Sequence, residues 1–335
     1  MALGVRVGAI ARWLEAQWRR EDPHLLLRAL SPVWQVASAA HLAWRARRAA
    51  RAPLPVISVG NITAGGSGKT PFCAWLAEAL AAQGEKPAIL SRGRCRHPRR
   101  VHPDDDPAIV GDEPLMLAMR GLFVIAGRNR IAAAHLAARL GATVAILDDG
   151  FQYRKLVRDL DIVLIPNAGV GNGRVLPAGP LREPLSALAR ADAIVRTGMG
   201  EPEAPVPLPA GKPVFRLRWR VEGLVQMAGP PTPPPRRAFA VAAIARPHRF
   251  LDALAEAGVA VGGHMFFADH HRYSRAEAQT LAQKAPVVCT EKDAAKLIRL
   301  WPKDAPLFVL KIAPQPSPKL LAFIQTKLAE IRKRR

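Results

Sequence analysis

Short apolar runs alternate with helical stretches along most of this 335-residue chain. Each run has the length of one buried strand, and the stretch that follows it is long enough for a helix. This rhythm predicts an α/β fold in which a mostly parallel sheet is covered on both faces. The expected strands are Val56–Val59, Pro87–Leu90, Phe123–Ala126, Thr143–Leu147, Asp161–Ile165, Ala193–Arg196, Val214–Arg218, Ala238–Ala243, Val287–Cys289 and Leu307–Leu310.

Three further segments have a clear character. Proline-rich composition predicts loops over Glu201–Pro213 and Pro230–Pro235. The tail, Ser317–Arg335, has an amphipathic pattern and ends in basic residues, so we expect a C-terminal helix there.

The first fifty residues combine apolar and basic positions in the pattern of amphipathic helices. Their longest uncharged run, Ala29–Trp44, contains Pro32 and is short for a membrane-spanning helix. We therefore expect this basic amphipathic segment to lie on a membrane surface rather than to cross the membrane. The alternative is an ordinary helical hairpin that packs on the core.

Charge narrows the class of partner. The net charge is +22, from 49 Lys and Arg against 27 Asp and Glu, which favours an anionic partner. Aromatic residues make up only 6% and no nucleic-acid module is evident, so nucleic acid is the weaker choice of partner.

The three cysteines have no CxxC pairing, which disfavours both a disulfide framework and a structural zinc site.

A glycine-rich loop follows the first strand. Gly65-Gly66-Ser67-Gly68-Lys69-Thr70 stands between an apolar run and a helical pattern, which is typical of a phosphate-binding loop. Backbone N–H groups and the helix N-terminus would bind phosphate oxygens, while Lys69 would contact a terminal phosphate and Thr70 a Mg²⁺ ion. The loop is a variant, because Thr63 stands where the usual spacing has glycine.

Two further acidic motifs complete the predicted chemistry. Asp148 and Asp149 end a buried strand, so they should reach the sheet edge where the loop lies and hold Mg²⁺. Asp112 and Glu113 precede a helical pattern, where Asp112 could simply cap the helix. A third motif, Asp269-His270-His271, offers an imidazole that could orient a carboxylate or bind metal.

Together these motifs resemble the tetraacyldisaccharide 4′-kinases of lipid A biosynthesis. The resemblance runs through nearly the whole chain, and the motifs follow the order of that family. They are Asn61-Ile62-Thr63, the loop with Pro71, Leu90-Ser91-Arg92-Gly93, Gly111-Asp112-Glu113-Pro114, Asp148-Asp149-Gly150-Phe151-Gln152, Leu176–Pro184, Ile244–Pro247 with Arg249-Phe250, Asp269-His270-His271 and Thr290–Ala294.

The resemblance implies an ATP-dependent kinase with Mg²⁺, acting on the 4′-hydroxyl of a tetraacylated glucosamine disaccharide 1-phosphate. It implies catalytic roles for Asp112 as base, His270 as its partner and Lys69. The remaining roles fall into three sets. They are ATP binding at Thr63, Ala64, Gly65, Gly66, Ser67, Gly68, Lys69 and Thr70, metal binding at Thr70, Asp148, Asp149 and Glu183, and substrate binding at Asn61, Arg92, Glu113, Arg130, Gln152 and Arg182.

The family's architecture is P-loop NTPase-like, with two α/β/α domains facing each other across a cleft. Applied to this chain, it implies an N-terminal helix and nucleotide-binding domain over residues 1–160, a second domain over 161–310, and a C-terminal helix over 311–335 that returns to the first domain. It also implies peripheral attachment to the cytoplasmic face of a Gram-negative inner membrane, an anionic lipid substrate, no nucleic-acid ligand and no obligate protein partner.

Some features leave room for other interpretations. Arg94 and Tyr153 replace an aromatic residue and a histidine that are common in the family. Arg182 and Glu183 could form a local ion pair, and Thr290 with Asp293 fits a helix capping box.

The main alternative function is a membrane-peripheral P-loop switch or metallochaperone NTPase, which would bind a protein partner and phosphorylate no lipid. A metal-dependent phosphoesterase or a membrane-binding scaffold accounts for fewer of the motifs.

Overall fold

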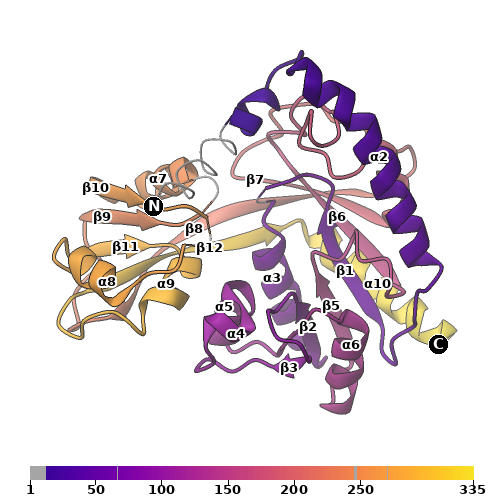
Figure 1. Cartoon of the computed structure of the whole chain (residues 1–335). Helices are drawn as coiled ribbons and strands as arrows, with labels where there is room; N and C mark the ends of the chain where they lie inside the picture. The colour runs from indigo at the N-terminus through magenta and orange to yellow at the C-terminus, as the bar shows by residue number, and fades with distance from the viewer. Residues whose placement is uncertain (1–12, 66, 245–246, 270) are drawn as a thin grey trace.

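The computed structural model describes residues 13–335 except residues 66, 245, 246 and 270. The strands of this described part form one continuous sheet in the order β10-β9-β11-β12-β8-β7-β6-β1-β5-β2-β4-β3. Figure 1 shows a larger group of elements and a smaller group, with the sheet running through both. The fold is therefore a mixed, mostly parallel α/β sheet, as predicted.

The larger part contains the first half of the chain. Neighbouring strands in it are parallel except β3, which is antiparallel to β4. Its strands are β1 (Val56–Asn61), β2 (Pro87–Ser91), β3 (Arg99–Arg100), β4 (Val124–Ala126), β5 (Val144–Asp148), β6 (Leu160–Pro166) and β7 (Ala193–Gly198). Its helices are α2 (Leu25–Ala46), α3 (Lys69–Ala81), α4 (Pro107–Val110), α5 (Asp112–Met119), α6 (Arg130–Arg139) and the 3₁₀ helix η1 (Leu185–Arg190).

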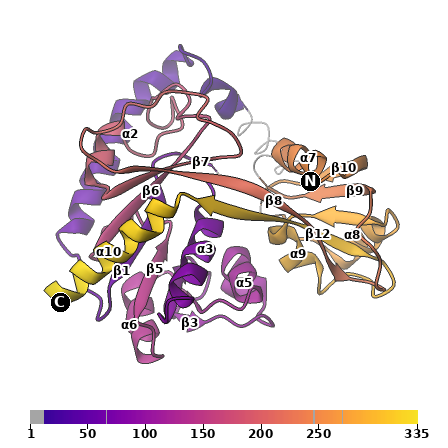
Figure 2. The same ribbon diagram turned by 180° about the vertical axis from the view of Figure 1, so that it is seen from behind.

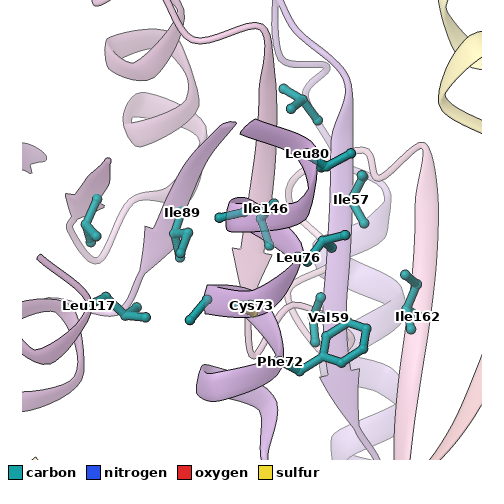
Figure 3. Close-up of a cluster of buried hydrophobic side chains, with 14 of the residues drawn as sticks. Ile57, Val59, Phe72, Cys73, Leu76, Leu80, Ile89, Leu117, Ile146 and Ile162 are labelled. Carbon is teal, nitrogen blue, oxygen red and sulfur yellow. The ribbon is translucent and has the colours of Figure 1, made fainter. Parts of the chain in front are cut away.

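Alternate residues of the strands pack on opposite faces of the sheet. Ile57 and Val59 of β1 share a buried cluster with α3, whereas Val56 belongs to a cluster with α6. Figure 3 shows Phe72 and Leu76 of α3 among the strand residues of the first cluster. Burial of apolar surface on both faces is the main favourable term that holds these layers together.

The smaller part is built from β9 (Arg237–Ala242), β10 (Ala260–Phe266), β11 (Val287–Cys289), α7 (Pro247–Glu256), α8 (Arg275–Ala282) and α9 (Glu291–Leu297). The long strands β8 (Val214–Ala228) and β12 (Leu307–Pro316) pair antiparallel and join it to the larger part. Figure 2 shows these two strands crossing from one part to the other, after which the chain ends in α10 (Pro318–Arg334).

The predicted strands are all present, but several bounds differ. β8 and β12 continue well beyond Arg218 and Leu310, because each provides the other with an antiparallel partner that no local pattern reveals. Two strands, β3 and β10, were not predicted. β10 contains Gly262 and Gly263 and lies at the sheet edge, so its sequence has a weak strand pattern.

The expected division of the chain into domains stays a prediction. In the structure, β6 begins at Leu160 and continues the larger part together with β7, since β6 pairs with β1 and β7 pairs with β6. The change from one part to the other occurs within β8 and β12. α10 packs on the larger part, because Leu320, Ile324 and Leu328 are buried in the cluster around α3.

The described part of the N-terminal segment is helical at residues 13–17, turns at residues 18–22 and then forms the long helix α2. α2 buries Leu27 and Leu42 and leaves a row of large apolar residues in solvent. That row includes Leu26, Leu30 and Val33, which recur at helical spacing and are 60, 45 and 65% exposed. Among the described helices, none combines the length and the hydropathy needed to cross a bilayer.

The packing of α10 generates a stability prediction. Ile324→Ala should lower the free energy of unfolding by about 2–5 kcal/mol, because a fully buried side chain leaves a cavity between α10 and α3. Urea unfolding measures this change. Ile109→Ala is the matched control, since Ile109 is 49% exposed and should cost far less. Equal losses from the two variants would show that α10 is not part of this core.

Candidate active site

The loop between β1 and α3 has a backbone that only glycine adopts easily. Gly65 and Gly68 have φ values of 103° and 78°, in the left-handed region, and α3 begins at Lys69. Gly66 lies outside the described residues. The hydroxyl of Ser67 is buried and has no partner among the described residues. A helix N-terminus preceded by such a turn is suited to an anion.

A second segment holds this loop in place. The backbone N–H of Ala64 donates to the carbonyl of Pro180 at 2.7 Å, and Thr63 forms an isolated bridge with Leu181. The hydroxyl of Thr197, in β7, donates to the carbonyl of Ser67 at 3.3 Å. The motif at 176–184 thus supports the shape of the loop.

The two aspartates lie at the sheet edge beside the loop, as predicted. Asp148 ends β5, which pairs in parallel with β1. The Thr70 hydroxyl donates to Oδ2 of Asp148 at 3.2 Å. The Lys69 ammonium lies 3.3 Å from Oδ1 of Asp149, and Arg182 lies 3.1 Å from Oδ2 of the same carboxylate. Lys69 and Thr70 are therefore each paired with one aspartate.

The environment of these aspartates shifts their pKa values in opposite directions. Burial raises the pKa of Asp148 to about 7, and the nearby charges of Glu113 and Asp149 act in the same direction. Burial also acts to raise the pKa of Asp149, but Lys69 and Arg182 outweigh it and lower that pKa. Asp149 is consequently ionised at neutral pH, whereas the pKa of Asp148 lies near neutrality.

The N-terminus of α5 brings two more carboxylates to this edge. Asp112 is buried and is the first residue of α5, while the N-cap position belongs to Gly111, with φ 96°. The interpretation of Asp112 as a helix cap is therefore wrong. The effect of Glu113 on the pKa of Asp148 shows that the start of α5 lies close to the end of β5.

Basic side chains gather near the same carboxylates. Arg130 is buried, and burial lowers its pKa, as does the neighbouring charge of Arg92. Its backbone N–H donates to the hydroxyl of Tyr153 at 3.1 Å, and its guanidinium lies 5.8 Å from that ring. The tyrosine that replaces the family's common histidine therefore helps to place Arg130.

Three other predicted residues form a supporting network. Glu183 accepts hydrogen bonds from Arg190 at 2.7 Å and from Gln152 at 3.1 Å, so both of its oxygens have partners. Gln152 also donates to the carbonyl of Asn61 at 2.9 Å, and Asn61 donates to the carbonyl of Thr63. These contacts support the entry to the loop.

The alternative of a local ion pair between Arg182 and Glu183 is wrong, since each residue pairs with a different partner, Asp149 and Arg190. Throughout the described part of the chain, no three His, Cys, Asp or Glu side chains lie together as a complete metal site.

A cleft of about 580 Å³ opens beside the loop, between the two parts of the molecule. Ser67, Gly68 and Met116 line it from the larger part, and Arg249 and Lys292 line it from the smaller part.

The predicted catalytic His270 lies outside the described residues. Its neighbour Asp269 pairs with Lys292 at 2.8 Å, and His271 lies 3.1 Å from Glu277.

Trp219 is a residue that the sequence did not single out. Its indole packs against Gly68, so that a Cβ atom added there would lie 2.4 Å from Cζ2 of the ring. Apolar residues alternate with arginines along Phe215–Val221, which could have shown that Trp219 faces the core. Its contact with the loop depends on long-range packing that alternation does not reveal.

Known proteins are similar to this chain in sequence and fold. The family of tetraacyldisaccharide-1-P 4′-kinases, LpxK, matches residues 23–329. The chain is 40% identical to the tetraacyldisaccharide 4′-kinase of Chromobacterium violaceum, over 95% of this chain and 98% of that protein. It is 39% identical to the kinase of the same name from Dechloromonas aromatica, with the same coverage.

A solved structure agrees with these relatives. The crystal structure of LpxK from Aquifex aeolicus in complex with ATP superposes with a TM-score of 0.73 at 30% identity, covering 91% of this chain and all of that one. The phosphate-binding loop, the paired aspartates and the family motifs occur here in one chain of the same fold. The chain therefore belongs to the tetraacyldisaccharide 4′-kinase family.

Proposed function

We propose that this protein transfers the γ-phosphoryl group of ATP to the 4′-hydroxyl of a tetraacyl glucosamine disaccharide 1-phosphate, a step of lipid A biosynthesis. Membership of the family gives the reaction. The observation that carries the proposal is the pairing of Lys69 with Asp149 and of Thr70 with Asp148 at one sheet edge. A switch or metallochaperone NTPase would not need the carboxylates at the start of α5.

The loop residues would bind and stabilise the phosphates. The N–H groups at the start of α3 and the Lys69 ammonium are donors for the oxygens of the transferring group, on which charge is spread in the transition state. Asp149 pairs with both Lys69 and Arg182 and so holds the Lys69 ammonium in place. Because these groups are already oriented, little reorganisation is needed when the phosphoryl group moves.

Thr70 and Asp148 would hold Mg²⁺. Their oxygen atoms are the hard ligands that this ion prefers, and Mg²⁺ in phosphoryl-transfer sites is held by one or two protein groups, phosphate oxygens and water. The raised pKa of Asp148 fits a cation, since excess negative charge from Glu113 and Asp149 lies beside it. When bound, the ion supplies neutralisation of phosphate charge. Glu183, also expected at the ion, has other partners for both oxygens.

Asp112 would act as the base for the acceptor hydroxyl. It would take the proton of the 4′-hydroxyl as that oxygen bonds to the γ-phosphorus and the bond to the ADP oxygen breaks. We keep His270 as the proposed partner of Asp112. The sugar and phosphate contacts are proposed for Arg92, Glu113 and Arg130, which lie close to Asp148 or to one another.

The exposed row on α2 supports attachment to a membrane surface. Leu26, Leu30 and Val33 face solvent, and Arg47 and Arg48 follow the end of the helix. An apolar face flanked by arginines is suited to an interface with anionic lipid, where an acylated substrate would be met. By family, that surface would be the cytoplasmic face of the inner membrane.

Loss of the loop lysine tests the phosphate site. Lys69→Ala should lower transfer of label from γ-labelled ATP to the lipid by about 10²-fold or more, because the developing charge loses a fixed cation. Lys327→Ala is the control, since that ammonium pairs with Glu330 on α10, and it should keep full activity. Transfer by Lys69→Ala within tenfold of the wild type would contradict the assignment.

The metal ligands are tested by titration. A chelator in excess should stop lipid phosphorylation, and Asp148→Asn should need about tenfold more Mg²⁺ for half-maximal rate, because a charged oxygen ligand is lost. The exposed Asp104 gives a matched control variant, Asp104→Asn, with an unchanged Mg²⁺ requirement. An unchanged requirement in Asp148→Asn would remove Asp148 from the metal site.

The role of α2 is tested with vesicles. The double variant Leu26→Asp/Val33→Asp should bind anionic phospholipid vesicles more weakly than the wild type in a sedimentation assay, because two apolar contacts become charged. It should still phosphorylate substrate dissolved in detergent. Ile109→Asp places the same change on an exposed residue elsewhere and should not affect sedimentation. Equal vesicle binding by all three proteins would rule out this face of α2.

A further inference from the structure

Helix α9 contacts the buried cores of both parts of the molecule. Ala295 packs in the cluster that contains α3 and α5, whereas Ala294 and Leu297 pack in the cluster of the smaller part. Figures 1 and 2 both show α9 beside α5. The helix begins within the motif at 290–294, for which only a capping role was expected.

The first residue of α9 is tied to both α5 and the joining strands. The carboxylate of Glu291 binds Arg120, at the end of α5, through both oxygens, with 3.2 Å between Nε and Oε1. Lys311 of β12 binds the same carboxylate. Glu291 and Arg120 are 17 and 18% exposed, so this pair is largely shielded from solvent. Two parallel bonds fix distance and orientation as well as charge.

Asp293, which is fully buried, connects α9 to the smaller part of the molecule. It accepts the backbone N–H of Ala243 at 3.0 Å, the hydroxyl of Tyr273 at 3.1 Å and the ammonium of Lys296 at 3.1 Å. A buried carboxylate costs free energy unless it has such partners. A variant that removes one partner would therefore leave the Asp293 charge less well compensated. This set fixes α9 against the end of β9.

Two lysines of α9 also contact the segment that carries the histidine motif. Lys292 pairs with Asp269 at 2.8 Å, and Lys296 donates to the carbonyl of His271 at 3.2 Å. With Tyr273 bonded to Asp293, described residues on both sides of position 270 are tied to one helix.

We infer that α9 couples the two sides of the catalytic cleft, with Glu291 and Asp293 as positioning residues for phosphoryl transfer. The inference rests on the proposed function, in which Asp112 at the start of α5 is the base. Glu291 fixes the far end of that short, rigid helix, and Asp293 fixes the facing segment. Displacement of a reacting group by about 1 Å can cost 10²-fold in rate, so ties that hold Asp112 and the facing segment in place affect turnover.

The test is a double-mutant cycle on lipid phosphorylation. Glu291→Gln should lower kcat about tenfold and change KM for ATP less than about twofold, because the described contacts that hold the nucleotide loop come from Pro180 and Thr197 rather than from α9. In an Asp112→Asn background, where the base is already lost, Glu291→Gln should lower the residual rate less than about twofold further. Arg120→Gln should reproduce both results, since it removes the other half of the pair.

Glu330→Gln provides the matched control, because Glu330 forms an exposed pair with Lys327 on α10 and should leave kcat unchanged. Thermal unfolding confirms that each variant is folded at the assay temperature. A full tenfold loss in the Asp112→Asn background, or a loss confined to KM for ATP, would overturn the coupling. A wild-type protein that labels no lipid would instead overturn the proposed function, and the coupling with it.

Discussion

The rest of the site depends on one electrostatic arrangement, in which the Lys69 ammonium and the Thr70 hydroxyl lie against the two aspartates that end β5. A parallel sheet makes this possible, since the carboxyl ends of β1 and β5 meet at the same edge. Lys69 and Arg182 keep Asp149 ionised against the effect of its burial, whereas burial raises the pKa of Asp148, beside which a further cation would be favourable.

The surrounding structure serves to keep that edge in place. Gly68 adopts a conformation that other residues avoid, and Trp219 occupies the space where a side chain would be. Thr197 and the motif at 176–184 hold the loop from the neighbouring strands. These contacts come from segments more than a hundred residues downstream of the loop, which explains why the kinase motifs extend so far along the chain.

The sequence predicted the parts of the fold that local chemistry determines. The buried strands, the glycine turn and the C-terminal helix follow from apolar runs, backbone freedom and periodicity. Long-range pairing was not predictable in this way: the extensions of β8 and β12 exist only because they pair with each other. The same holds for partners within the site. Glu183 was expected at a metal ion, yet Arg190 and Gln152 occupy its oxygens.

We propose that the sheet edge beside Asp148 transfers phosphate to a lipid alcohol and that Asp112 acts as the base. The most direct measurement is the appearance of label from γ-labelled ATP in the tetraacyl disaccharide 1-phosphate, in detergent with Mg²⁺, for the wild type and Asp112→Asn. We predict labelled lipid from the wild type and a rate lower by about 10²–10⁴-fold in the variant. Turnover of ATP with no labelled lipid, or equal rates for the two proteins, would contradict that claim.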